Sequence, residues 1–360
     1  MPLHRLPLLL SFAGALACAA TTQQPTLPND DAATFTNPLL SSGPDPWVLQ
    51  KDGIYYYMHT TGGNLTLRRT RDLSQLASAE QKVVWTPPAT GPYSRNIWAP
   101  EIHFLDGSWY IYFAADDGAN RNHRMWVIQN ASADPFQGEW VMRGKIADPS
   151  DRWAIDGSVV EHGGQRYFVW SGWPGAENGV QNIYIAPMSN PWTLAGERVL
   201  LSTPTHPWEM VGDIQRANPA DGPPHVDVNE GPQILPRGDR LFLIYSASGC
   251  WTDSYALGML TADAASDPLD PDSWSKSPRP VFEGSPAARA YAPGHNSFFT
   301  SPDGSEEWIL YHANPEPGLG CGGRRSPRMQ RIEWRPDGTP DFGTPVPLGE
   351  PIERPSGEGL

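Results

Sequence analysis

The chain has 360 residues, a formal net charge of −14, 39 prolines, 35 glycines and 15 tryptophans, and only 18% of its residues are charged. Nucleic acids and anionic membranes bind basic surfaces, so this balance argues against both as partners. Abundant glycine, proline and aromatic residues favour short strands joined by tight turns over helices. We therefore expect an all-β protein.

The first 20 residues have a basic start, a short apolar run over 6–16 and small residues up to Ala20. This pattern is typical of a secretory signal peptide, and the run is too short to span a membrane. Residues 21–36 are expected to form an N-terminal tail, and residues 37–360 a single domain. The protein is thus predicted to be secreted and extracellular, and to act as a monomer.

One sequence pattern recurs along the predicted domain: a polar residue, an apolar run, a glycine-containing turn and an aromatic strand. It is clearest at 98–115, where Glu101 precedes the Asp106-Gly107 turn and the strand at 109–113. An Asp-Gly pair between two strand-forming runs is a strong hairpin signal. Four further copies begin at Asp45, Asp156, Glu230 and His295. Five copies, spaced roughly 55–75 residues apart, predict a five-bladed β-propeller.

In chain order, the blades are expected at about 37–85, 98–143, 153–201, 228–274 and 289–334. Residues 203–227 contain several prolines and glycines with little periodicity, which predicts a long loop beside the pocket. The chain after residue 336 is expected to return beside the first blade and close the ring. The strands that begin the blades would then bring the five polar residues together at one mouth of the axis.

Two cysteines remain once the leader is removed, Cys250 and Cys321. In an oxidising compartment this pair predicts one disulfide between the fourth and fifth blades, with two buried free thiols as the alternative. N-glycosylation motifs begin at Asn64 and Asn130, which is consistent with a secreted glycoprotein.

Four carboxylates on a narrow axis repel one another and raise one another's pKa values unless they are paired, hydrogen-bonded or held by a cation. Such a cluster indicates either a functional site or a structural ion. Converging carboxylates among aromatic side chains suit glycoside hydrolysis, in which one acid protonates the leaving oxygen and a second carboxylate acts as base or nucleophile. Four tryptophans lie near the strand ends, where they would pack on a sugar ring or within the core: Trp47, Trp98, Trp173 and Trp251.

Four short motifs, in this order, resemble those of glycoside hydrolase family 43: residues 43–47 (GPDPW), 98–101 (WAPE), 154–158 (AIDGS) and 229–232 (NEGP). The resemblance covers essentially the whole chain after the leader, and it implies a five-bladed propeller and an inverting mechanism. It further implies that Asp45 is the general base, that Glu230 is the general acid, and that Asp156 orients Glu230 and tunes its pKa. Glu101 would have only a supporting role.

The resemblance also assigns residues that contact the sugar. His295 matches the family's axial histidine, near an ion or water under the sugar, so it is a candidate metal contact through water. Arg328 resembles a late sugar-binding arginine, although Arg324 or Arg325 fits if the register shifts. The paired carboxylates require no cofactor for the chemistry, and oxygen ligands on the axis would suit a structural Ca²⁺.

Details around 67–70, 76–80 and 97–103 are most similar to the exo-acting α-1,5-L-arabinofuranosidases of this family. The expected substrate is therefore arabinan or arabino-oligosaccharide, from which terminal α-L-arabinofuranose would be released. Within the hydrolases, the alternatives are an endo-α-1,5-arabinanase, an arabinofuranosidase that debranches arabinoxylan, and a β-xylosidase. Outside them, the alternative is a sugar-binding propeller (a lectin) without catalysis.

Overall fold

The computed structural model describes residues 1–2, 34–214 and 223–359. The predicted signal peptide, apart from its first two residues, and the predicted tail up to residue 33 lie outside the described residues. A compact unit begins at Thr34. In the described part of this unit the elements are strands and short 3₁₀ helices, so the predicted all-β class is confirmed. Within the described residues, no helix has the length and apolar character needed to cross a membrane.

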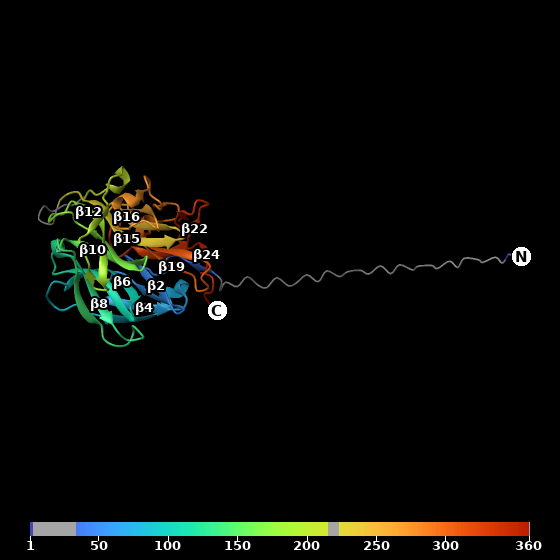
Figure 1. Ribbon diagram of the computed structural model, residues 1–360, viewed down its shortest axis with the longest axis horizontal. Coiled ribbons are helices and arrows are strands. Elements are labelled where there is room, and N and C mark those ends of the chain that lie inside the picture. Colours follow the sequence, from blue (N-terminus) through green and yellow to red (C-terminus); the bar gives the residue numbers. More distant parts are fainter. Residues whose placement is uncertain (3–33, 215–222, 360) are drawn as a thin grey trace. The chain divides into compact units, whose positions relative to one another are not determined.

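The strands form five consecutive antiparallel sets (Figure 1). The first set contains β2 (Trp47–Lys51), β3 (Ile54–Met58), β4 (Leu65–Thr70) and β5 (Glu80–Trp85), with η2 (Leu73–Ser78) before β5. The second contains β6 (Arg95–Leu105), β7 (Ser108–Asp116), β8 (Arg124–Asn130) and β9 (Val141–Ile146), with η3 (Asn120–Asn122) before β8. The third contains β10 (Ala154–His162), β11 (Gln165–Gly172), β12 (Val180–Asn190), β13 (Thr193–Leu194) and β14 (Val199–Ser202).

The fourth set follows η4 (Pro207–Glu209) and contains β15 (Asp227–Arg237), β16 (Arg240–Ala247), β17 (Ala256–Asp263) and β18 (Ser275–Lys276), with η5 (Pro271–Ser273) before β18. The fifth contains β19 (Tyr291–Thr300), β20 (Glu307–Asn314) and β21 (Ser326–Arg331). Two small sheets complete the unit: β22 (Glu333–Trp334) with β23 (Pro340–Asp341), and β1 (Thr34–Thr36) with β24 (Pro351–Glu353).

The first strands of the five sets contact one another in a closed cycle. β2 contacts β6, β6 contacts β10, β10 contacts β15, β15 contacts β19, and β19 returns to β2. In addition, β12 pairs with β15 in parallel over two residue pairs, which joins the third and fourth sets into one nine-stranded sheet. We call these five first strands (β2, β6, β10, β15 and β19) the inner strands. The cycle of contacts holds their starts around one centre.

The predicted hairpin turns explain how the inner strand of a set is joined to the next strand. Asp106 and Gly107 have φ of 49° and 76°, and Leu105 pairs with Ser108 on either side of them. Asp52 and Gly53 repeat this geometry with φ of 53° and 70°. A two-residue turn with positive φ at both positions matches the twist of the strands it joins, and glycine adopts it without steric cost.

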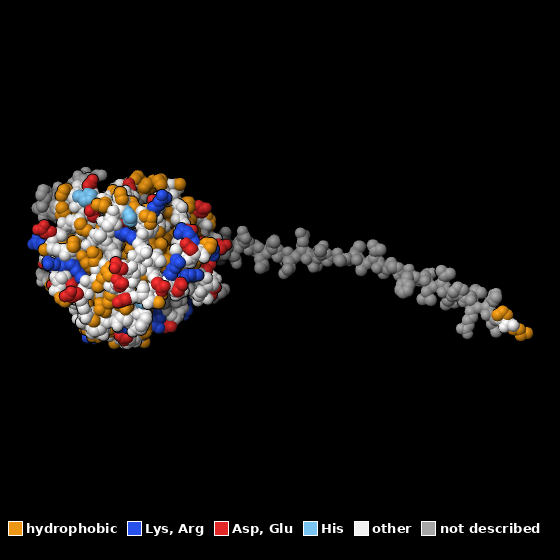
Figure 2. Space-filling model, turned by 45° about the horizontal axis from the view of Figure 1, so that its top comes forward, with side chains coloured by type: hydrophobic (Ala, Val, Ile, Leu, Met, Phe, Trp, Pro, Cys, Tyr) orange, Lys and Arg blue, Asp and Glu red, His pale blue; other side chains and the backbone are white. Residues whose placement is uncertain are grey.

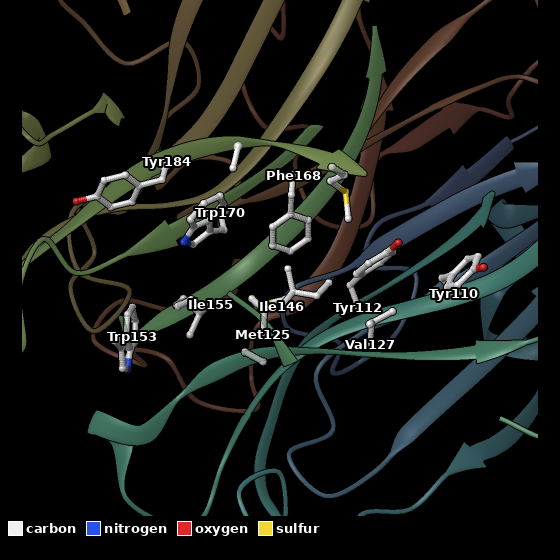
Figure 3. Packing of buried hydrophobic residues seen from close by; sticks show 14 of the residues in the cluster. Tyr110, Tyr112, Met125, Val127, Ile146, Trp153, Ile155, Phe168, Trp170 and Tyr184 are labelled. Atoms are coloured by element: carbon white, nitrogen blue, oxygen red, sulfur yellow. The ribbon is translucent and has the colours of Figure 1, made fainter. Parts of the chain in front are cut away.

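Side chains of neighbouring sets interlock to form the core, as Figure 3 shows for the second and third sets. Tyr112 of β7 and Met125 of β8 pack against Phe168 and Trp170 of β11, and all four are at most 3% exposed. A Cβ on Gly157 would lie 2.1 Å from the Phe168 ring, so only glycine fits there. Burying each large apolar side chain contributes about 1.5–3 kcal/mol, which holds the second and third sets against each other.

The two ends of the described unit meet, as expected from the sequence for the chain after residue 336. Thr34–Thr36 pairs with Pro351–Glu353, so the end of the predicted tail is a strand. The Glu358 carboxylate accepts the Leu73 backbone N–H of the first set at 2.7 Å.

On the face shown in Figure 2, lysine and arginine side chains are scattered among acidic ones and form no single basic patch.

The two N-glycosylation motifs differ in the folded chain. Asn130 is 1% exposed, its amide donates to the Gln137 carbonyl at 2.6 Å, and its side-chain oxygen accepts the Ser132 N–H at 2.8 Å. A buried asparagine with both ends engaged is not available to a glycosyltransferase after folding. Asn64 is partly exposed, so we keep only Asn64 as a candidate acceptor.

Candidate active site

A cavity of about 700 Å³ contains four of the five polar residues that begin the inner strands. They are Asp45, Asp156, Glu230 and His295, and each is at most 9% exposed. The predicted convergence is therefore present for these four. Other residues that line the cavity come from several sets, among them Thr60, Trp98, Trp153, Gln181, Trp251 and Arg325.

The backbone explains why these side chains leave the regular strand pattern. Asp45, Asp156 and His295 have φ of 55°, 54° and 51°, in the left-handed region that residues with a Cβ rarely adopt. Pairing with the second strand is interrupted between Ile155 and Ser158 and again between Glu230 and Gln233. Such bulges redirect a side chain at some cost in backbone strain, about 1–3 kcal/mol per residue, and they are common at functional sites.

Asp45 is surrounded by groups that stabilise its ionised form. Arg325 Nη1 lies 2.8 Å from Oδ1, and the Thr60 hydroxyl donates to Oδ2 at 2.7 Å. Burial raises the pKa of the Asp45 carboxyl, but the Arg325 charge, His295, His312 and the Thr60 hydrogen bond together hold this pKa well below its ordinary value. Asp45 is therefore a carboxylate at any pH near neutral.

The Glu230 carboxyl, unlike that of Asp45, has a raised pKa. Burial raises the pKa of the Glu230 carboxyl to about 7, although a hydrogen bond from Tyr255 and the charge of Arg325 oppose the shift. The Tyr255 hydroxyl lies 2.8 Å from Glu230 Oε1. A carboxyl with a pKa near 7 keeps its proton in a large fraction of molecules at pH 6–7, so it can donate that proton.

Asp156 is attached to the segment that carries Glu230. Its Oδ2 accepts the backbone N–H of Gly231 at 3.0 Å, and His295 Nδ1 lies 3.9 Å from the same oxygen and 3.6 Å from Asp45 Oδ1. Burial, followed by the nearby Glu230 and Asp45 charges, raises the pKa of Asp156 well above its ordinary value. Burial also lowers the pKa of His295, which favours a neutral ring between the two carboxyls.

The structure corrects the predicted arginine. Arg328 is fully buried, does not line the cavity, and donates to the Arg289 carbonyl at 2.8 Å. Arg324 is largely exposed and lies 3.9 Å from Glu316. Arg325, named from the sequence only as an alternative, lines the cavity and contacts Asp45. It comes directly before β21, and where that strand begins decides which arginine faces the site.

Of the four tryptophans named from the sequence, Trp98 and Trp251 line the cavity and the other two do not. Trp47 donates its indole N–H to the Ile102 carbonyl at 2.8 Å, and it lines a different cavity of about 340 Å³. Trp173 stacks on Trp153 with ring centroids 4.8 Å apart, and it is 3% exposed. Both therefore pack inside the protein, which was the alternative weighed for each. Trp98 does line the cavity, and its indole stacks on His123 at 4.1 Å.

Glu101 does not line the cavity, although it belongs to the copy of the repeat that is clearest in the sequence, at 98–115. His103 Nε2 lies 3.0 Å from its Oε2, and the Gln233 amide donates to its Oε1 at 3.1 Å. Both oxygens are thus engaged, one by His103 of the same strand and the other by Gln233 of β15. This placement fits the supporting role that was expected for Glu101.

The side chains in the described part of the chain do not by themselves form a metal site on the axis. Among the described residues, no group of three or more His, Cys, Asp or Glu side chains is arranged to hold a metal ion. Both oxygens of Glu101 are engaged, and both oxygens of Asp45 have protein partners. These residues do not fit a closed Ca²⁺ cage, which needs six to eight oxygen ligands.

Tyr255, His312 and Thr60 belong to the site but were not predicted from the sequence. Tyr255 contacts Glu230, Thr60 contacts Asp45, and the Asp45 N–H donates to His312 Nδ1 at 3.0 Å. Tyr255 and His312 come from segments distant in sequence from the motifs that they support, and no local pattern marks them. Thr60 follows β3, whose pairing with β2 brings it back beside Asp45, so the predicted hairpin could have pointed to it.

The loops around the cavity agree with two further predictions. Cys250 and Cys321 form a disulfide, and both residues line the cavity. The described ends of the 203–227 loop also contribute, through Ile214 and Val226. Its η4 segment is anchored by Glu209, which is fully buried and lies 2.7 Å from the Lys276 ammonium. Residues 215–222 of the predicted loop lie outside the described residues.

Several known proteins are similar to this chain in sequence and in fold. The chain is 40% identical over 346 residues to an extracellular exo-α-(1→5)-L-arabinofuranosidase of Streptomyces avermitilis, with 93% of this chain and 68% of that protein covered. It is 39% identical to a protein of the same name from Streptomyces chartreusis, with 84% and 90% covered. The crystal structure of an α-L-arabinofuranosidase from Lactobacillus brevis superposes with a TM-score of 0.80 at 38% identity, with 88% and 98% covered. Residues 35–340 match the model of glycosyl hydrolases family 43, and the chain belongs to that family.

Proposed function

We propose that this protein is a secreted, inverting α-L-arabinofuranosidase that releases terminal arabinose from arabinan and arabino-oligosaccharides. The observation that carries the proposal is one cavity in which Asp45 is held ionised and Glu230 is held protonated near neutral pH. This is the pair of states that acid–base hydrolysis of a glycoside requires. The relatives named as exo-α-(1→5)-L-arabinofuranosidases support the choice of sugar and linkage.

In this mechanism Asp45 removes a proton from the attacking water while Glu230 protonates the departing oxygen. The Asp156 carboxyl accepts the Gly231 N–H and thereby orients Glu230, and its tuning of the Glu230 pKa is part of this proposal. The nearby Asp45 charge adds to the burial that raises the pKa of Glu230. Arg325 fixes Asp45 and replaces Arg328 as the arginine near the sugar. Trp98 would pack on the sugar, and His295 would lie beneath it between Asp45 and Asp156.

We further propose that the five antiparallel sets are the blades of a five-bladed β-propeller that forms one domain. The cycle of contacts among β2, β6, β10, β15 and β19 supports this reading. Secretion is supported by the leader-like residues 1–20, by the Cys250–Cys321 disulfide and by relatives named as extracellular. The enzyme would act as a monomer on its carbohydrate substrate.

Product analysis with linear α-1,5-arabinan tests the proposed function. An exo-acting enzyme releases arabinose alone from the earliest time point, because it cleaves only the terminal bond of the chain. Early arabino-oligomers would contradict exo action and favour an endo-arabinanase. Binding of arabino-oligosaccharides without any product from arabinan, arabinoxylan or xylosides would contradict the hydrolase and favour a sugar-binding propeller.

The pH dependence provides a second prediction, centred on Tyr255. Since the protonated form of Glu230 is active, kcat/KM should fall as pH rises through about 7. The Tyr255 hydrogen bond favours the ionised carboxylate and so lowers this pKa. Tyr255→Phe should therefore raise the pKa of Glu230 and move the alkaline limb of the kcat/KM profile to higher pH. A limb that stays in place or moves to lower pH would show that Tyr255 does not act on the catalytic acid.

A further inference from the structure

In an inverting reaction the attacking water and the leaving group lie on opposite faces of the sugar. The proposed mechanism therefore assigns a base side and an acid side to the cavity. Asp45, the proposed base, is held by Thr60 and by Arg325. Glu230, the proposed acid, lies on β15, and an acid must stand beside the oxygen that departs. The leaving group of the substrate therefore lies on the β15 side of the cavity.

Gln181 lines the cavity on this side. It belongs to β12, whose parallel pairing with β15 places Val180 opposite Asp227 and Gln181 opposite Val228. Val228 is two residues before Glu230, so it points to the same side of β15 in a regular strand. The register thus brings the Gln181 amide next to the segment that carries the proposed acid.

The Gln181 side chain has an unused hydrogen-bonding group. The residue is only 7% exposed, and its Oε1 is buried with no hydrogen-bond partner among the described residues. An unpaired buried polar atom costs about 1–3 kcal/mol, so buried amides usually have partners. A ligand hydroxyl in the cavity would supply the missing donor.

The surroundings hold Gln181 in place and suit a sugar ring. The Asp227 N–H donates to the Gly179 carbonyl at 3.0 Å, which fixes the start of β12 against β15. Val226 and Trp251 line the same cavity and add apolar surface. The Trp251 indole is fixed by donating its N–H to the Asp213 carbonyl at 3.1 Å. A polar amide beside fixed apolar side chains is the usual composition of a sugar site.

We propose that Gln181 is part of the leaving-group subsite and accepts a hydrogen bond from a hydroxyl of the arabinofuranosyl unit that departs. This inference rests on the proposed arabinofuranosidase activity and adds to it a residue that recognises the second sugar. It predicts that Gln181 matters for substrates with a sugar leaving group and not for those with an aryl leaving group.

The test compares Gln181→Leu with the wild type on α-1,5-arabinobiose and on 4-nitrophenyl α-L-arabinofuranoside. We expect kcat/KM for arabinobiose to fall about tenfold, near the upper end of what one neutral hydrogen bond contributes. The value for the aryl substrate should change less than about twofold, since the aryl group offers no hydroxyl to Gln181.

Asn182→Leu is the matched control. Asn182 is the next residue of β12, is 4% exposed, carries a side-chain oxygen without a partner among the described residues, and does not line the cavity. It should leave the ratio of the two kcat/KM values unchanged. Equal losses on both substrates in Gln181→Leu would overturn the subsite assignment and leave the arabinofuranosidase activity intact. A wild-type protein inactive on both substrates would overturn the proposed function as well.

Discussion

Replacing Glu230 with Gln is expected to lower kcat/KM on α-1,5-arabinobiose by about 10³-fold, within the 10²–10⁴-fold range that general acid–base catalysis contributes. The amide keeps the shape of the side chain but has no acidic proton to give to the departing alkoxide. On 4-nitrophenyl α-L-arabinofuranoside the loss should be under about tenfold, because nitrophenolate departs with little help from an acid.

Tyr255→Phe is the matched control for this result. It removes the hydroxyl that lies 2.8 Å from Glu230 Oε1 but leaves the carboxyl in place. At pH values below the alkaline limb, where Glu230 is protonated in both proteins, its rates on the two substrates should fall by similar, small factors. An equal loss on both substrates in Glu230→Gln would show that Glu230 shapes the site and does not act as the acid.

Replacing Asp45 with Asn is expected to lower kcat/KM on both substrates by about the same factor, on the order of 10³-fold. The attacking water must lose a proton whatever group departs, so a better leaving group cannot compensate. The asparagine keeps an oxygen that can accept the Arg325 hydrogen bond, and its amide NH₂ can donate to the Thr60 hydroxyl oxygen, which limits structural disturbance.

Thr60→Val serves as the control for Asp45. It removes one hydrogen bond to the carboxylate but leaves the carboxylate in place. Because that bond favours the ionised form, its loss should raise the pKa of Asp45 and move the acid limb of the pH profile to higher pH. Asp45→Asn with near wild-type turnover of the aryl substrate would remove Asp45 as the general base.

Much of the fold could be predicted from local sequence, because each hairpin carries its own turn chemistry. The Asp52-Gly53 and Asp106-Gly107 turns appear where expected, and the polar residues before them begin the inner strands. The repetition of the pattern then predicts that the polar residues converge, because equivalent positions in a radial repeat meet at one end of the axis. Asp45, Asp156 and Glu230 were found in this way.

The direction of individual side chains could not be predicted, because it depends on tertiary contacts. Trp47 is only two residues from Asp45, yet it turns away to bond Ile102 of the next set. Arg325 and Arg328 are three residues apart, and the point at which β21 begins decides which of them meets Asp45. Tyr255, which directly precedes β17, contacts Glu230 of β15, and no pattern in the sequence connects the two.

The most direct test of the central claim is the configuration of the first arabinose released from an α-linked substrate. The claim is that water activated by Asp45 attacks as Glu230 protonates the leaving oxygen, in a single displacement. Proton NMR during the first minutes, before mutarotation equilibrates the anomers, should show β-L-arabinofuranose first. If α-L-arabinofuranose appears first, the reaction retains configuration, and a carboxylate then acts as nucleophile in contradiction to this account.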